Sequence, residues 1–143
     1  MNVLSLASAQ AIIAGALAEA RGRAAKPLAV VVLDAGGHPV AFAREDGATM
    51  FRHDIARAKA VGAIGMGDDT RILAGRATAN PAFFQSVTAV VAGNIAFSPG
   101  GVLVRQQGQV IGAVGISGDT GDCDEECALA GIRAAGFDME PVK

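Results

Sequence analysis

The chain has 143 residues and a formal net charge of −2, and 51% of its residues are hydrophobic. This length fits one domain covering 1–143, and the composition excludes intrinsic disorder, which requires low hydrophobicity and high net charge. A slightly acidic chain without tryptophan or tyrosine offers neither the positive surface nor the stacking platforms of a nucleic-acid-binding protein. No apolar run has the length of a membrane span and the amino terminus lacks a signal-peptide pattern, so we expect a cytoplasmic protein without nucleic-acid or membrane partners.

The first third of the chain predicts a helix followed by a β-hairpin. Apolar residues recur at helical spacing over 5–21, with Ser5 at the N-cap. The valine-rich run 28–34 is typical of a strand that is covered on both faces. A glycine-containing turn then leads into a returning strand over 39–44, so these two strands are predicted to pair.

The middle of the chain predicts three helices, over 49–65, about 70–77 and 81–89. Asp69 or Thr70 can cap the second helix, and Asn80 before a proline is a typical start of the third. Residues 90–101 show no clear pattern and end in a Pro-Gly-Gly turn.

The last third predicts a second hairpin and a closing helix. Strands over 102–105 and 109–117 are joined at a Gln-Gly turn. Asp122 and Glu125 have the spacing of a capping box, so we expect Asp122 to be the N-cap of a helix that ends before Gly136. Hairpin-linked strands with helices between them predict an antiparallel sheet in an α+β fold.

Several common site chemistries have no motif in the sequence. The chain lacks a phosphate-binding P-loop, a zinc-protease helix motif, a C-x-x-C pair and the nucleophile elbow of hydrolases. Cys123 and Cys127 stand four residues apart on the predicted last helix, which is too few ligands for a zinc site and is typical of small, partly buried apolar side chains. We therefore predict no metal site.

Two clusters of charged residues are candidates for a site. The acidic cluster Asp119, Asp122, Asp124 and Glu125 surrounds a helix start; it is either a capped helix terminus, a site for a metal or hydroxyl-bearing ligand, or a partner for basic side chains across a groove. The basic cluster Arg44, His53, Arg57 and Lys59 either binds a carboxylated ligand or forms a solvated helix face.

Four segments together resemble a known family: 35–48, 54–60, 99–104 and 108–119. Their sequence and order are similar to the GlcG/HbpS-like family of haem-binding and haem-degrading proteins, which includes the C-terminal domain of PduO-type proteins and small proteins encoded beside catabolic genes. The resemblance implies a profilin-like α/β/α sandwich around an antiparallel sheet of about five strands, the fifth within 90–98. It also implies homo-oligomers assembled from dimers, up to octamers, which agrees with a chain rich in glycine and alanine that gains from burying more surface.

The positions that match the family's motifs are Arg44, Asp46, Gly47, Lys59, Gly100, Gly101, Gly118, Asp124 and Glu125. His53 stands where relatives have a small polar residue, so it either supplies a new ligand or base or is neutral. We expect the site in a groove between the end of the strand at 44, the helix that carries His53 and Lys59, and the acidic helix start at 124–125.

The first functional hypothesis is a small-molecule-binding protein with haem as the preferred ligand. His53 is the candidate axial ligand, with Met50 or Met66 behind it, and the candidate propionate partners are Arg44, Arg57 and Lys59. The small number of aromatic residues predicts a shallow site.

The second hypothesis is an enzyme without an organic cofactor, an isomerase, tautomerase or lyase that moves a proton on a small carboxylated catabolite. His53 or Glu125 would be its general base, and Arg44 and Lys59 would hold the carboxylate. The third is a structural or sensory partner without a ligand.

Overall fold

The computed structural model describes residues 3–139. Its elements in chain order are α1 (Leu6–Gly22), β1 (Ala29–Asp34), β2 (Pro39–Arg44), α2 (Phe51–Met66), α3 (Thr70–Ala79), α4 (Pro81–Val90), β3 (Gly101–Gln106), β4 (Gln109–Ser117) and α5 (Gly121–Ala134). The predicted helices and both predicted hairpins are confirmed, with ends that shift by one or two residues. Among the described residues, no helix is both long and apolar enough to cross a membrane.

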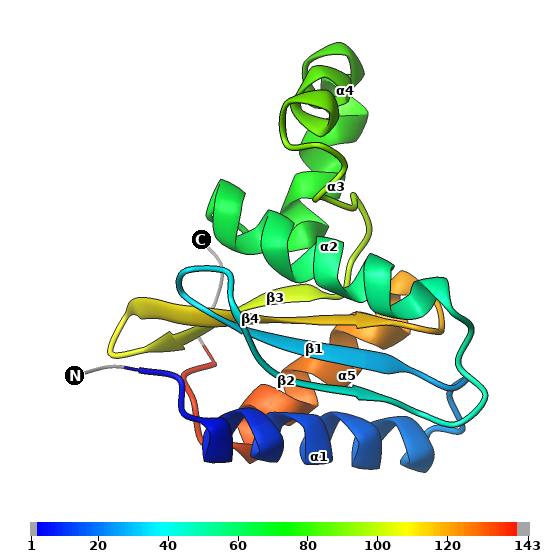
Figure 1. Cartoon of the computed structure of the whole chain (residues 1–143), viewed down its shortest axis with the longest axis vertical. Coiled ribbons are helices and arrows are strands. Elements are labelled where there is room, and N and C mark those ends of the chain that lie inside the picture. Colours follow the sequence, from blue (N-terminus) through cyan, green and yellow to red (C-terminus); the bar gives the residue numbers. More distant parts are fainter. Residues whose placement is uncertain (1–2, 140–143) are drawn as a thin grey trace.

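The four strands form one antiparallel sheet in the order β2-β1-β4-β3. The two hairpins therefore meet along β1 and β4, where Val30 is opposite Ile116 and Val32 is opposite Val114. Helices α1 and α5 cover one face of the sheet and α2 covers the other, which confirms an α+β fold of three layers (Figure 1).

The expected fifth strand is absent from the described part of the chain, so that prediction was wrong. Helix α4 ends at Val90, and the residues after it form a turn with Ala92 at φ 55° and Gly93 at φ 77°. Left-handed backbone of this kind breaks an extended run. Residues 94–99 then carry the chain back toward β3 outside any strand, and the Gly100 carbonyl oxygen accepts a hydrogen bond from the Ile116 N–H of β4 at 3.0 Å.

The core consists of two apolar layers, one on each side of the sheet. In β1, Val30 and Val32 pack toward α1 and α5, whereas Val31 and Leu33 pack toward α2. Successive side chains of a strand point to opposite faces, and both faces are covered here, which explains why the predicted strand is a continuous apolar run.

Small residues bring the layers close together. A Cβ atom at Gly115 of β4 would overlap the carbonyl oxygen of Ala56 in α2, and one at Gly15 of α1 would lie 2.7 Å from Ala134 Cβ in α5. The glycine content of the chain therefore has a packing role at these contacts.

Ser5, Asp69 and Asn80 stand at the N-cap positions predicted for them, and only the cap of α5 differs from its prediction. Ser5 caps α1 as expected, because its Oγ accepts a hydrogen bond from the Ser8 N–H at 3.1 Å. The N-cap of α5 is Thr120, whose Oγ1 accepts from the Cys123 N–H at 3.2 Å, so the assignment to Asp122 was wrong. Neither Asp69 nor Asn80 caps a helix with its side chain. The Asp69 carboxylate instead accepts from the Leu103 N–H of β3 at 2.9 Å.

Candidate functional site

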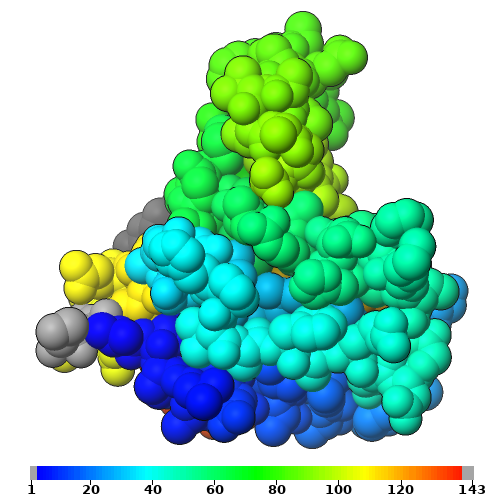
Figure 2. All heavy atoms as spheres, viewed as in Figure 1, coloured from blue at the N-terminus to red at the C-terminus, as the bar shows by residue number. Residues whose placement is uncertain are grey.

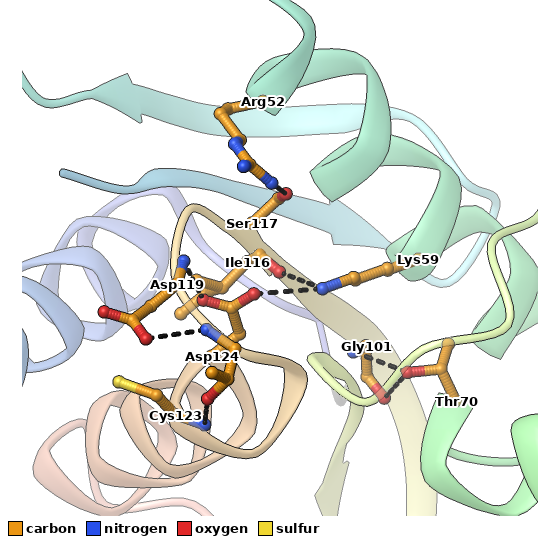
Figure 3. A network of polar contacts seen from close by, with 10 residues as sticks. Arg52, Lys59, Thr70, Gly101, Ile116, Ser117, Asp119, Cys123 and Asp124 are labelled. Atoms are coloured by element: carbon orange, nitrogen blue, oxygen red, sulfur yellow. Dashed lines mark hydrogen bonds and ion pairs between the residues drawn. The ribbon is translucent and has the colours of Figure 1, made fainter. Parts of the chain in front are cut away.

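The predicted site residues fall into two separate places, one inside the protein and one on its surface. At the inner place, Lys59 of α2 meets Asp124 of α5 beside the end of β4 (Figure 3). Lys59 Nζ donates to Asp124 Oδ2 at 3.1 Å and to the Ile116 carbonyl oxygen at 2.8 Å. Asp124 Oδ1 accepts from the Asp119 N–H at 3.0 Å.

This ion pair lies in the interior, with only 3% of the Lys59 side chain and 2% of the Asp124 side chain exposed. Burial lowers the pKa of Lys59 and raises the pKa of Asp124, and the attraction between the two groups opposes both shifts. The pair connects α2, β4 and α5, three elements from three layers of the fold.

Gly100 and Gly101 pack directly over this pair. Gly100 has φ +127°, and a Cβ atom there would lie 2.8 Å from Lys59 Nζ. The Gly101 N–H donates to Thr70 Oγ1 at 2.8 Å, which attaches α3 to β3 (Figure 3). Lys59, Gly100, Gly101 and Asp124 therefore come together as the motif match suggests, in a buried cluster without room for a ligand between them.

The other carboxylates of the acidic cluster all have structural partners. Asp119 accepts from the backbone N–H groups of Lys26 and Thr120 at 2.8 and 2.7 Å, and these bonds lower its pKa. Arg71 of α3 binds Asp122 at 2.5 Å and Glu125 at 2.8 Å. Of the alternatives stated for the acidic cluster, the structure shows the pairing with basic side chains. The sequence could not show this, because Arg71 is far from them along the chain.

The outer place is an open hollow of about 500 Å³ between β2 and the beginning of α2. Its lining residues are Phe42, Ala43, Arg44, Met50 and His53. The two segments lie side by side on the face of the molecule that Figure 2 shows in cyan and blue-green. The His53 ring stands edge-on to the Phe42 ring, with 4.5 Å between centroids.

Three kinds of functional group converge on this hollow. The Met50 side chain is largely exposed, with 70% of its residue surface accessible. His53 Nδ1 lies 3.8 Å from Asp54 Oδ1, and 41% of the His53 side chain is exposed. Among residues 3–139, Arg44 has neither an ion pair nor a side-chain hydrogen bond.

A second hollow of about 400 Å³ adjoins Arg44 on its other side. It is lined by Arg21, Pro27, Arg44, Glu45 and Asp46. Arg21 is already paired with Glu45 at 3.0 Å, so Arg44 is the free cation between the two hollows among the residues described. The structure thus brings Arg44, Asp46 and His53 to one surface and separates them from Lys59 and Asp124.

The remaining predicted residues lie elsewhere. Met66 ends α2, and thirteen residues of helix place it roughly 20 Å from His53. Arg57 donates to Asn94 Oδ1 at 3.1 Å. A Cβ atom at Gly118 would overlap the Pro27 carbonyl oxygen, so Gly118 permits close backbone packing.

Sequence reasoning missed Phe42 and Arg52. Phe42 is an exposed aromatic residue on β2, and the alternating pattern of that strand was the available signal. Arg52 donates to Ser117 Oγ at 3.1 Å at the end of β4, close to the buried pair (Figure 3).

Comparison with solved structures finds the same fold in several proteins. PduOC, solved as a haem complex, is 24% identical, with a TM-score of 0.88 over 98% of this chain and 100% of that chain. A double mutant of HbpS from Streptomyces reticuli is 28% identical, with a TM-score of 0.81 over 95% and 89%. ORFY of Klebsiella pneumoniae is 26% identical, with a TM-score of 0.87 over 94% and 92%.

A comparison with curated proteins found no match. A family model described as haem-degrading protein HbpS-like matches residues 4–133, which is nearly the whole chain. The chain therefore belongs to the HbpS-like family.

Proposed function

We propose that this protein is a cytoplasmic, oligomeric haem-binding protein whose ligand lies in the hollow between β2 and α2. The observation that carries the proposal is the presence of His53, Met50 and Phe42 on one open surface with Arg44, which has no side-chain partner among residues 3–139. Membership of the HbpS-like family and the haem complex of PduOC support the choice of ligand.

The chemistry of these side chains fits a haem. Imidazole and thioether groups are axial ligands of haem iron in proteins, so His53 would hold the iron and Met50 lies beside it. The Phe42 ring offers an apolar face, and Arg44 would bind a propionate by charge-assisted hydrogen bonds. A bound haem would supply the redox chemistry of its iron. The protein's own residues would orient the ligand and limit access of water to one face.

The alternative is an enzyme without a cofactor that moves a proton on a small carboxylated compound. His53 would be the base and Arg44 would hold the carboxylate. The other residues named for this chemistry, Lys59 and Glu125, are each held in an ion pair. Only His53 and Arg44 therefore support this alternative, and the same hollow would hold the substrate.

Titration with haemin, followed by absorbance, tests the proposal. The parent protein is expected to saturate at one haemin per chain with a sharp Soret band, and His53→Ala is expected to lose that band. His38→Ala is the matched control, because His38 is the other histidine and is exposed in the turn between β1 and β2. Equal titrations of the two variants would overturn the role of His53.

A second ligand isolates the role of Arg44. Arg44→Ala should bind haemin about tenfold more weakly, a loss of about 1.4 kcal/mol. Haemin dimethyl ester lacks the carboxylates, so it should bind the parent and Arg44→Ala equally. If the ester also binds Arg44→Ala more weakly than the parent, Arg44 acts on something other than the propionates.

A further inference from the structure

Helix α5 carries two free cysteines that the proposed function does not use. Cys123 is half-buried, and Cys127, one turn later, is fully buried. Residues four apart lie on the same face of a helix, and these two side chains share a hydrogen bond. Figure 3 shows the Cys123 sulfur pointing away from Lys59, so the thiols belong to a different part of the molecule from the buried ion pair. The chain thus holds two sulfur atoms side by side against an apolar core.

Helix geometry makes a disulfide between these cysteines unfavourable. Cβ atoms four residues apart on a helix are about 5–6 Å from each other, whereas a disulfide needs about 3.5–4.5 Å. Closing that bond would distort the turn of α5 that carries Asp124, the partner of Lys59. An ion between the two sulfurs bridges a longer distance than a direct bond between them does. The pair therefore fits a bridging metal ion better than it fits oxidation to a disulfide.

The number and kind of donors select the metal. A structural zinc ion needs four ligands, and within residues 3–139 no three His, Cys, Asp or Glu side chains gather in a way that could hold a metal ion. Cu(I) is a soft ion that prefers thiolates, and two of them complete a linear complex. Our expectation of no metal site rested on the four ligands that zinc needs, and Cu(I) needs only two.

A positive charge and an opening to solvent lie beside the pair. The Arg23 guanidinium, at the end of α1, is close enough to both sulfurs to interact with them electrostatically. Two thiolates and one Cu(I) ion carry one net negative charge, and the complex would share Arg23 with Glu19, which binds it at 2.7 Å. Arg23 and Glu19 also line an open hollow of about 640 Å³ between α1 and α5. Solvent therefore reaches the side of the pair where Arg23 lies.

We propose that Cys123 and Cys127 bind one Cu(I) ion as a linear bis-thiolate complex. Each thiol releases its proton on binding, two sulfur–copper bonds form, and copper keeps its single positive charge, so no oxidant or reductant takes part. The apolar side chains between α1 and α5 would shield the ion from water. This site lies on the α1–α5 side of the sheet, whereas the proposed haem site lies between β2 and α2. The inference therefore goes beyond the proposed function and does not depend on it.

Competition with a coloured chelator tests the site. The reduced parent, titrated without oxygen against the Cu(I)–bicinchoninate complex, is expected to remove one Cu(I) ion per chain and to bleach the complex in proportion. Cys123→Ser should bind Cu(I) more than about a hundredfold more weakly, because even partners outside a ligand set contribute about 10–100-fold. The double variant Cys123→Ser, Ala7→Cys is the matched control. It keeps two thiols per chain but places the second on the exposed face of α1, so it should bind as weakly as Cys123→Ser.

A variant at the other hollow shows whether Cu(I) binds there instead. Met50 is an exposed soft donor at the proposed haem site, and Met50→Leu should take up Cu(I) as the parent does. Melting curves of all variants without copper show whether each is folded, and Cys123→Ser should remain folded because Cys123 is only half-buried. A parent that takes no Cu(I) from the chelator would overturn the proposal. So would parental affinity in the Ala7→Cys control, or loss of Cu(I) binding in Met50→Leu.

Haemin titration of Cys123→Ser separates the two proposals. If this variant loses Cu(I) but binds haemin as the parent does, the thiol site is supported independently of the haem site. If it keeps Cu(I) with parental affinity and binds haemin, the copper proposal fails while the proposed function stands.

Discussion

Lys59 and Asp124 form an ion pair in the interior, with 3.1 Å between Nζ and Oδ2 and almost no exposed surface on either side chain. Each buried charge is compensated by its partner, and further by hydrogen bonds: Lys59 donates to Ile116, and Asp124 accepts from the backbone of Asp119 and Gly118. Such a pair adds little stability compared with an apolar pair, but removing one member leaves an unpaired buried charge.

We therefore expect Lys59→Met and Asp124→Asn each to lower the free energy of unfolding by about 3–5 kcal/mol. The double variant should lose clearly less than the sum of the two, because it has no unpaired charge. Urea unfolding of the four proteins at neutral pH gives the coupling energy. If the loss of the double variant equals the sum of the two single losses to within about 0.5 kcal/mol, the two side chains act independently.

Lys59 and Asp124 also show what could not be predicted from the sequence. A lysine in an alanine-rich helix stood out, and we assigned it to a ligand. Its partner is 65 residues away, and we expected Asp124 across an open groove from Lys59 rather than in a buried contact with it. Periodicity predicted the helices and hairpins well, because it reports which face each element buries.

The errors have the same origin. Thr120 and Asp122 are both acceptable N-cap residues; in the structure Thr120 is the cap, and Asp122 instead binds Arg71 of another helix. The expected strand within 90–98 came from the family resemblance, and left-handed residues at 92 and 93 exclude it at that turn. Arg44 and His53 were predicted as neighbours because β2 leads directly into α2, a relation that is local in the chain.

The cap assignment gives a second prediction. Thr120→Ala should destabilise the protein by about 1 kcal/mol, because it removes the acceptor for the Cys123 N–H. Thr120→Ser should restore most of that loss. Asp122→Ala removes only an exposed ion pair and should cost less than about 1 kcal/mol. Thermal or urea unfolding measures the stability of all three variants. A larger loss of stability for Asp122→Ala than for Thr120→Ala would show that Asp122 is the N-cap of α5.

Close packing between α2 and β4 gives a third prediction. Gly115→Ala places a methyl group against the Ala56 carbonyl oxygen and should cost about 1–3 kcal/mol, since backbone must move. Gly75→Ala is the matched control: Gly75 lies inside α3, has open space around it and should stabilise the protein by about 0.5–1 kcal/mol. Urea unfolding compares them, and a neutral Gly115→Ala would mean that the two layers are not in tight contact.

The last prediction concerns Cys127, which is buried next to Cys123 in α5. Burial, with a smaller effect of the Cys123 sulfur, raises the pKa of the Cys127 thiol to about 12 from an ordinary value of 9.0. The folded state therefore keeps this proton at a pH where the unfolded chain has lost it. Stability from this group is fully present below about pH 9 and falls as the pH rises from there toward 12.

Melting temperatures measured between about pH 8 and pH 10 should decline less in Cys127→Ala than in the parent, because the variant has no thiol there to titrate. Cys123→Ala is the control. Its side chain is only partly buried, and it leaves the Cys127 thiol in place, so its melting temperature should decline with pH nearly as the parent's does. If Cys127→Ala loses stability with pH as steeply as the parent, the Cys127 proton is not the one released on unfolding, and another group must account for the alkaline decline.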